Sequence, residues 1–133
     1  MTQSWSMLIA FCLIAATAQL ANARPAHRFD ATTNSCRDFS KGQAEWDSSP
    51  WGIGGQLFKT VCKSCHTRDN NTGAKFLWEE SKTSKAWNRV FFEKYPACAK
   101  NGSWQSITPE QLLSLNDYLY RFSANSQDAH DSA

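Results

Sequence analysis

The chain has 133 residues, 41% of them apolar, with 14 Lys and Arg against 12 Asp and Glu. This length predicts one domain, because it cannot supply two independent hydrophobic cores. The nearly even charge excludes a nucleic-acid binder held by overall charge. The apolar and aromatic content excludes a broadly disordered chain.

The first 23 residues contain no Asp, Glu, Lys or Arg, and residues 7–20 are mostly apolar. This run is shorter than the roughly 20 apolar residues that span a bilayer. Ala21 and Ala23 are small residues at the positions that a signal peptidase reads. We therefore expect a secretory signal over 1–23, cleaved after Ala23, and a periplasmic mature chain without a membrane span. An uncleaved membrane anchor is the alternative.

The mature chain divides by composition into an N-terminal arm (24–50), a central domain (51–123) and a polar C-terminal tail (124–133). The arm is rich in turn-forming residues, which favours an extended or partly helical segment. The tail is expected to fray.

Apolar residues at helical spacing predict helices over 54–61, 84–94 and 108–122 in the central domain. The last of these begins with Thr108, Pro109 and Gln111, which together favour a capped helix start. A further short helix is expected over 74–80. No run alternates convincingly between apolar and polar residues. The sequence thus predicts an all-α bundle of about three to five helices.

Cys62, Cys65 and His66 form the motif Cys-Lys-Ser-Cys-His. Two thiols three residues apart on a helical turn point to the same side, and each can add across one vinyl group of a porphyrin. The next residue, His66, can then place its imidazole on the iron. This spacing is typical of covalent haem c attachment, with His66 as the metal ligand.

The motif has three other interpretations. A zinc knuckle needs a second ligand pair, which the chain lacks. A thioredoxin-like redox pair needs a preceding strand in a βαβ context, which the sequence does not predict. A structural Cys62–Cys65 disulfide leaves His66 without a role.

The chain resembles the class I monohaem c-type cytochromes over roughly residues 51–122. Besides the motif, the resemblance rests on Gly54, Leu57 and Phe58 ahead of it, and on the segments 107–111 and 116–119. It implies two crossing helices that wrap one haem, and the central domain is then a cytochrome c-like haem domain. The function implied is an electron carrier for a larger redox enzyme, rather than an enzyme itself.

The chain departs from this family in two ways. Both methionines, Met1 and Met7, lie in the expected signal, so no Met remains to act as second axial ligand. Family members also carry a Pro soon after the haem His, whose carbonyl orients the imidazole. Here no Pro lies between His66 and Tyr95, and a carbonyl in 68–73 is expected to replace it.

The second axial position therefore stays open in the sequence. Residues with suitable side chains, besides water or no ligand at all, are His27, His130, Lys94, Lys100, Asn101, Tyr95 and Cys98. Cys36 and Cys98 are the cysteines left over in the mature chain, and an oxidising compartment favours a disulfide between them. That bond would remove Cys98 from the candidates.

An open or weakly capped iron would give the alternative function: binding of NO, CO or O₂, or reaction with peroxide. A role as a subunit of a multi-protein oxidoreductase is a third. Residues 59–100 hold nine basic and four acidic side chains. This excess favours a redox partner protein with an acidic docking surface.

Overall fold

The computed structural model describes residues 24–124. The expected signal segment, 1–23, and all but the first residue of the expected tail lie outside the described residues. The elements in chain order are β1 (His27–Asp30), β2 (Ser35–Asp38), α2 (Gly42–Asp47), α3 (Ile53–Leu57), the π-helical turn η1 (Phe58–Cys62), α4 (Lys63–Cys65), the 3₁₀ turn η2 (Glu79–Ser81), α5 (Ser84–Glu93), α6 (Ala97–Lys100) and α7 (Pro109–Phe122).

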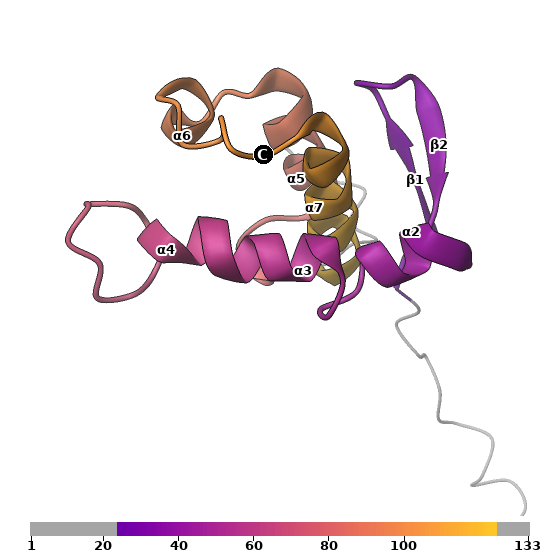
Figure 1. The fold of residues 1–133 in the computed structure, drawn as a ribbon, viewed down its shortest axis with the longest axis horizontal. Helices are drawn as coiled ribbons and strands as arrows, with labels where there is room; N and C mark the ends of the chain where they lie inside the picture. Colours follow the sequence, from indigo (N-terminus) through magenta and orange to yellow (C-terminus); the bar gives the residue numbers. More distant parts are fainter. Residues whose placement is uncertain (1–23, 125–133) are drawn as a thin grey trace, which may run out of the picture.

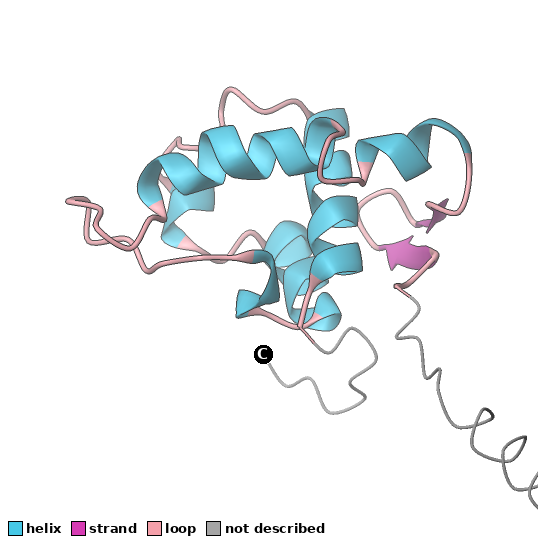
Figure 2. Cartoon of the chain, turned by 90° about the horizontal axis from the view of Figure 1, so that it is seen from below, coloured by secondary structure: helices cyan, strands magenta, loops and turns pink. Residues whose placement is uncertain are grey.

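A two-stranded antiparallel sheet makes the fold mixed α and β, so the all-α prediction is wrong. The arm expected to be extended or partly helical contains this hairpin and then α2. β1 and β2 pair with Phe29 opposite Cys36, and the sheet lies at one end of a mainly helical molecule (Figure 2). Along β1, Arg28 and Asp30 are buried whereas Phe29 is 58% exposed. Because the inward side chains are charged, the usual apolar alternation of a strand is missing.

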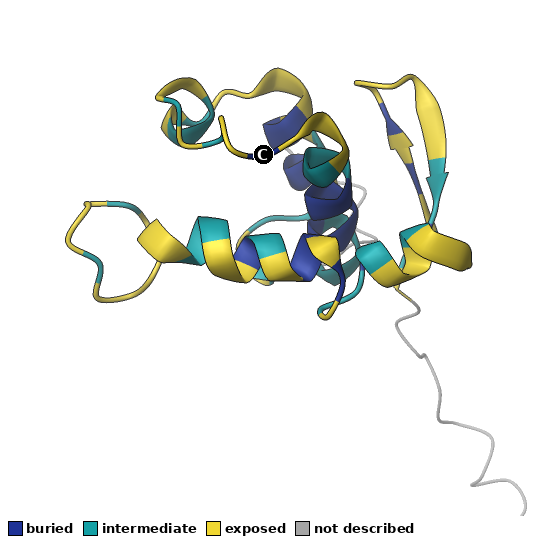
Figure 3. Ribbon diagram, viewed as in Figure 1, coloured by how far each residue is buried: buried dark blue, intermediate teal, exposed yellow. Residues whose placement is uncertain are grey.

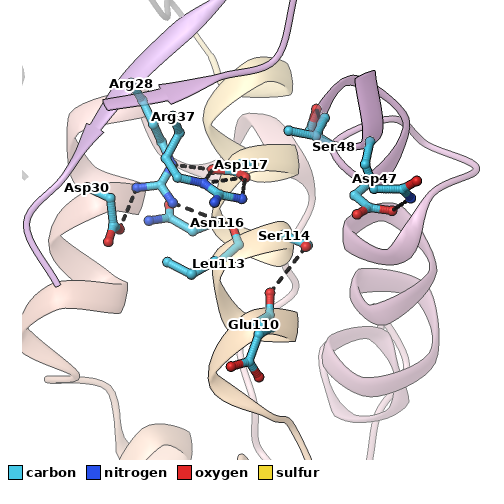
Figure 4. Close-up of polar contacts among 12 residues, drawn as sticks. Arg28, Asp30, Arg37, Asp47, Ser48, Glu110, Leu113, Ser114, Asn116 and Asp117 are labelled. Atoms are coloured by element: carbon cyan, nitrogen blue, oxygen red, sulfur yellow. Dashed lines mark hydrogen bonds and ion pairs between the residues drawn. The ribbon is translucent and has the colours of Figure 1, made fainter. Parts of the chain in front are cut away.

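Buried charges fasten the sheet to α7 (Figure 4). Arg28 Nε donates to Asp117 Oδ1 at 2.6 Å, and Arg37 Nη2 donates to Asp117 Oδ2 at 2.6 Å. Arg28 Nη1 also donates to Asp30 Oδ1 at 2.8 Å. Each carboxylate oxygen of Asp117 thus faces a guanidinium group, which offsets part of the cost of burying the charges.

The elements α3, η1 and α4 follow one another as a continuous helical rod, with α6 and the end of α4 at the side of the molecule away from the sheet (Figure 1). The rod confirms the helix expected over 54–61. It crosses α7 at Gly54, where a side-chain methyl group would lie 2.2 Å from the Ser114 carbonyl oxygen. The absence of a side chain at Gly54 therefore lets the two helices approach closely.

Both predicted helices after the motif are confirmed. In α7, Thr108 Oγ1 accepts from the Gln111 N–H at 3.2 Å, and Gln111 Oε1 accepts from the Thr108 N–H at 3.0 Å. Pro109 occupies the first helical position. Helix α5 ends at Glu93, because Lys94 turns into a left-handed conformation with φ of 50°.

The hydrophobic core lies where α5 and the rod pack against α7, and Figure 3 shows the buried residues along α5 and α7. Its members are Phe58, Trp87, Val90, Phe91, Leu115, Tyr118 and Leu119. All of them lie within the three ranges that apolar spacing predicts to be helical. Tyr95 lies beyond α5 and is 37% exposed.

The short helix expected over 74–80 is not formed. Residues 73–78 have no regular secondary structure, and within 74–80 a 3₁₀ turn begins only at Glu79, over Glu79–Ser81. Glu79 anchors this turn to the core, since Tyr118 donates to its carboxylate and Trp87 Nε1 donates to its carbonyl at 2.8 Å. Among residues 24–124, none of the helices has the length and apolar character needed to cross a membrane.

Candidate functional site

The two motif cysteines lie at the C-terminal end of the helical rod. Cys62 closes the π-helical turn and is partly buried at the edge of the core, whereas Cys65 ends α4 and is exposed. Both thiols are free. A π-helical turn is rare and is often found at functional sites.

His66 ends the helix, with φ of −94° and ψ of 42°. Its side-chain Nδ1 lies 2.6 Å from the backbone carbonyl oxygen of Lys75. A carbonyl can only accept, so Nδ1 carries the proton and donates, which leaves the lone pair on Nε2 for a metal. The orienting carbonyl therefore exists, two residues beyond the expected range of 68–73.

A compact loop brings the Lys75 carbonyl to His66. Its ends meet where the Leu77 N–H donates to the His66 carbonyl at 3.2 Å. Inside it, Asn70 Nδ2 donates to the carbonyls of Thr67 and Ala74, each at 2.7 Å. Asn70 Oδ1 accepts from the Ala74 N–H at 3.2 Å. Sequence reasoning missed Asn70, although Asn is a common turn former and Gly73 with positive φ follows it.

Burial controls the electrostatics of Cys62. Burial first, and the nearby Cys98 second, raise the pKa of the Cys62 thiol to about 12. Redox-active Cys-x-x-Cys pairs instead have a first cysteine with a lowered pKa, usually at a helix N-terminus. Cys62 has the opposite environment, and helical turns rather than a strand precede it. The thioredoxin-like interpretation therefore finds no support here.

A bare metal ion finds no ligand set in the described part of the chain. Among residues 24–124, no three His, Cys, Asp or Glu side chains are grouped to hold one. A zinc knuckle needs four protein ligands. Haem has a smaller demand, because the porphyrin itself supplies four nitrogen ligands.

The chemistry of the donor set fits haem c. Cys62 and Cys65 are free thiols on adjoining helical turns, and the His66 imidazole beside them has its protonated nitrogen already held by a carbonyl. Leu57 and Leu77, like Cys62, are partly buried and pack against the core. Partly buried apolar side chains can offer contact to a porphyrin, while the thiols can offer covalent attachment.

The structure distributes the candidates for the second axial position over different parts of the fold. His27 lies on β1, away from α4, with its Nε2 3.4 Å from Asp38 Oδ1. Lys94 and Lys100 line a cavity of about 420 Å³ whose lining includes the hairpin residues Thr32 and Thr33 but none of the motif residues. His130 lies outside the described residues.

The remaining candidates come from the segment between α5 and α7. The Asn101 carboxamide oxygen accepts from Ser103 N and Oγ, at 3.1 and 2.6 Å. The Arg89 guanidinium carbon lies over the Tyr95 ring, 5.6 Å from the ring centroid. Cys98 lies on α6 and is partly buried.

The expected Cys36–Cys98 disulfide is not formed, and both cysteines are free. Cys36 is exposed on β2, whereas Cys98 lies on α6, and Figure 1 shows these elements at different ends of the molecule. The sequence argument used only the number of cysteines and the compartment, which do not fix the distance that a disulfide requires.

Several basic side chains lie within the motif or close to it in the chain. The Lys63 ammonium lies 4.1 Å from the centroid of the Phe76 ring, and the Arg68 guanidinium lies 4.6 Å from it. Lys63 Nζ also donates to the Leu77 carbonyl at 2.6 Å. Lys59 and Lys75 are exposed on either side in the chain. Part of the positive charge predicted for 59–100 therefore lies beside the motif.

Comparisons of the chain with family models, curated proteins and solved structures gave no match.

Proposed function

We propose that this protein is an exported c-type cytochrome that carries single electrons to or from a larger redox enzyme. Cys62 and Cys65 bind one haem covalently, and His66 is its proximal ligand. The observation that carries the proposal is the contact between His66 Nδ1 and the Lys75 carbonyl. It holds the imidazole beside two free thiols with Nε2 available, the arrangement that a haem-ligating histidine needs.

Cys62 and Cys65 would hold the haem through two thioether bonds. Each S–H would add across one vinyl C=C, with sulfur on one carbon and hydrogen on the other, so that no oxidant or reductant would be needed. Burial keeps Cys62 in the protonated thiol form at neutral pH, since its pKa is raised to about 12. Cys65 is exposed and therefore accessible from solvent.

The bound haem would supply one-electron transfer between ferric and ferrous iron. The chain supplies position and surroundings. The loop clamped by Asn70 fixes the Lys75 carbonyl, and this carbonyl fixes the rotation and the tautomer of His66. The core beneath Cys62 excludes water from one side of the attachment site.

The charge beside the motif supports an acidic partner. Lys63 and Arg68 lie over one aromatic ring, and Lys59 and Lys75 are exposed nearby. Positive charge around an exposed redox centre speeds encounter with a partner of opposite charge, and the effect falls with salt. Rates of electron transfer that decrease as ionic strength rises would support this docking mode.

The test is maturation of the full chain in a cell that exports protein and attaches haem c. The expected product is red, is shortened by 23 residues, and has the mass of that chain plus one haem after denaturation. An alkaline pyridine spectrum reports whether both vinyl groups are saturated.

The matched variants are Cys62→Ser with Cys65→Ser, which should abolish covalent haem, and Cys36→Ser, which should leave it unchanged. A colourless wild-type product with the mass of the bare polypeptide would refute the proposed function.

A further inference from the structure

The proposed site does not yet have an assigned second axial ligand. The positions of the candidate residues in the fold reduce the number that could fill this role. His27 is paired with Asp38 on the sheet, away from α4. Lys94 and Lys100 line the cavity beside the hairpin turn. Asn101 accepts two hydrogen bonds from Ser103, and Tyr95 stacks under Arg89. Each of these side chains has an interaction or a location that does not involve the motif residues.

Although Lys100 lies on the same short helix, Cys98 differs from these candidates in being a free, partly buried thiol. It lies on α6, a helical turn that begins after Pro96 and ends where the Asn101 N–H donates to the Ala97 carbonyl at 2.9 Å. Figure 1 shows α6 at the same side of the molecule as α4. The Cys98 thiol is free and partly buried, and it lies close enough to Cys62 to affect its ionisation.

The segment that carries α6 is held against the core by an aromatic contact. Trp104, which follows α6, stacks on Phe91 of α5 with ring centroids 5.3 Å apart. Phe91 belongs to the core, and Trp104 packs against it. The thiol of Cys98 is therefore presented from a braced segment of the chain rather than from an open loop.

We propose that the Cys98 thiolate is the second axial ligand of the haem that His66 binds. The inference rests on the proposed function and deepens it. Thiolate sulfur is a soft, strong donor to iron, and binding releases the thiol proton to solvent. An anionic ligand favours ferric over ferrous iron, so the reduction potential should be lower than that of a thioether-ligated centre.

The experiment uses the matured, haem-loaded protein. X-ray absorption at the iron edge of the ferric wild type should show one sulfur ligand, and the electron spin resonance spectrum should be low-spin. Cys98→Ser should lose the sulfur signal, turn high-spin or water-ligated, and bind added cyanide faster. Cys98→Met should stay low-spin with a higher reduction potential.

Cys36→Ser and His27→Ala are the controls, and both should keep the wild-type spectrum. A wild-type spectrum without iron–sulfur scattering, or a Cys98→Ser protein with unchanged spectrum and potential, overturns the assignment of Cys98 while leaving haem attachment intact. Absence of covalent haem from the wild type is a separate result, which overturns the proposed function and this ligand together. Because the absorption measurement needs only the wild type, poor maturation of a variant does not remove the test.

Discussion

The Arg28 guanidinium and the Asp117 carboxylate, 89 positions apart in the chain, meet in the interior at 2.6 Å between Nε and Oδ1. Their side chains are 0% and 1% exposed. This ion pair joins the first strand to the last helix, so the N-terminal arm is part of the folded domain rather than an appendage. Arg37 approaches the second oxygen of Asp117 from the neighbouring strand.

Removing the charge of Asp117 should be strongly destabilising. In Asp117→Asn, Arg28 and Arg37 keep their positive charges near one another without the carboxylate between them. Breaking a buried pair in this way costs about 3–5 kcal/mol of unfolding free energy, measured by urea unfolding. Glu93→Gln is the control, since it breaks the exposed pair with Arg89 and should cost less than about 1 kcal/mol. Equal losses in the two variants would contradict the buried network.

Asp30 predicts how stability changes with pH. Burial alone would raise its pKa, but hydrogen bonds from Arg28 and Thr33 outweigh burial and hold the pKa below the usual 3.8. A carboxyl with a lowered folded-state pKa stabilises the fold above its unfolded pKa, and this contribution disappears as the pH falls through the folded value. We therefore expect the urea concentration at the unfolding midpoint to decrease as the pH is lowered below about 3.8. This decrease should be smaller in Asp30→Asn, whereas the control Asp69→Asn, at an exposed carboxylate, should leave it unchanged.

The close crossing of the rod and α7 predicts that Gly54 cannot be enlarged. In Gly54→Ala the new methyl group would meet the Ser114 carbonyl oxygen at 2.2 Å and Tyr118 Cβ at 2.6 Å. The helices must then separate, with a loss of about 1–3 kcal/mol from overpacking. Gln56→Ala, on the exposed face of the same helix, should be neutral. Thermal unfolding of the two variants compares them directly, and an unshifted midpoint for Gly54→Ala would refute the crossing.

Thiol labelling of the haem-free chain, 24–133, should separate the cysteines by environment. Thiolate is the reactive form, and the raised pKa of Cys62 leaves little of it at pH values near 8. Cys36 and Cys65 are exposed, so iodoacetamide should modify them first and Cys62 last, as read by peptide mass mapping. The order should vanish in denaturant. Rapid native labelling of Cys62 would show that its environment is not the one described.

In the haem-loaded protein that we propose, Asn70 should act on the haem through the Lys75 carbonyl. Asn70→Ala removes the clamp on Thr67 and Ala74, which should weaken the hydrogen bond that His66 donates. A less basic imidazole stabilises ferric iron less, so the reduction potential should rise. Asn71→Ala, the exposed neighbour, is the matched control. If the two variants show the same potential, the loop does not position His66.

The parts of the fold that sequence patterns captured are those whose signals are local. The cap at Thr108, the proline at Pro109 and the helical spacing of Leu115 and Leu119 all lie within a few turns of chain, and α7 follows from them. The sequence patterns did not predict the hairpin, because its inward residues, Arg28 and Asp30, are charged. Its alternation of apolar and polar residues is therefore the reverse of the usual one. Their partner, Asp117, is too distant in sequence for any periodic pattern to reveal.

The candidate site divides in the same way. Cys62, Cys65 and His66 were assigned from spacing alone, and the structure brings a carbonyl to His66 as haem ligation requires. The carbonyl that accepts from His66 was expected within 68–73 but belongs to Lys75, because loop length alone does not fix which residue turns its carbonyl inward. The Asn70 hydrogen bonds settle this choice in favour of Lys75. The Cys36–Cys98 disulfide failed because counting cysteines carries no distance information.

The π-helical turn Phe58–Cys62 lies between the part of the rod that packs on α7 and the part that carries Cys65 and His66. One extra residue in a turn swings everything after it by about 100° relative to a regular helix. The face of α3 that meets α7 and the sides on which Cys62 and Cys65 emerge are thus set independently. A one-residue shortening within this turn would leave the crossing intact but rotate Cys65 and His66 together about the helix axis relative to α7.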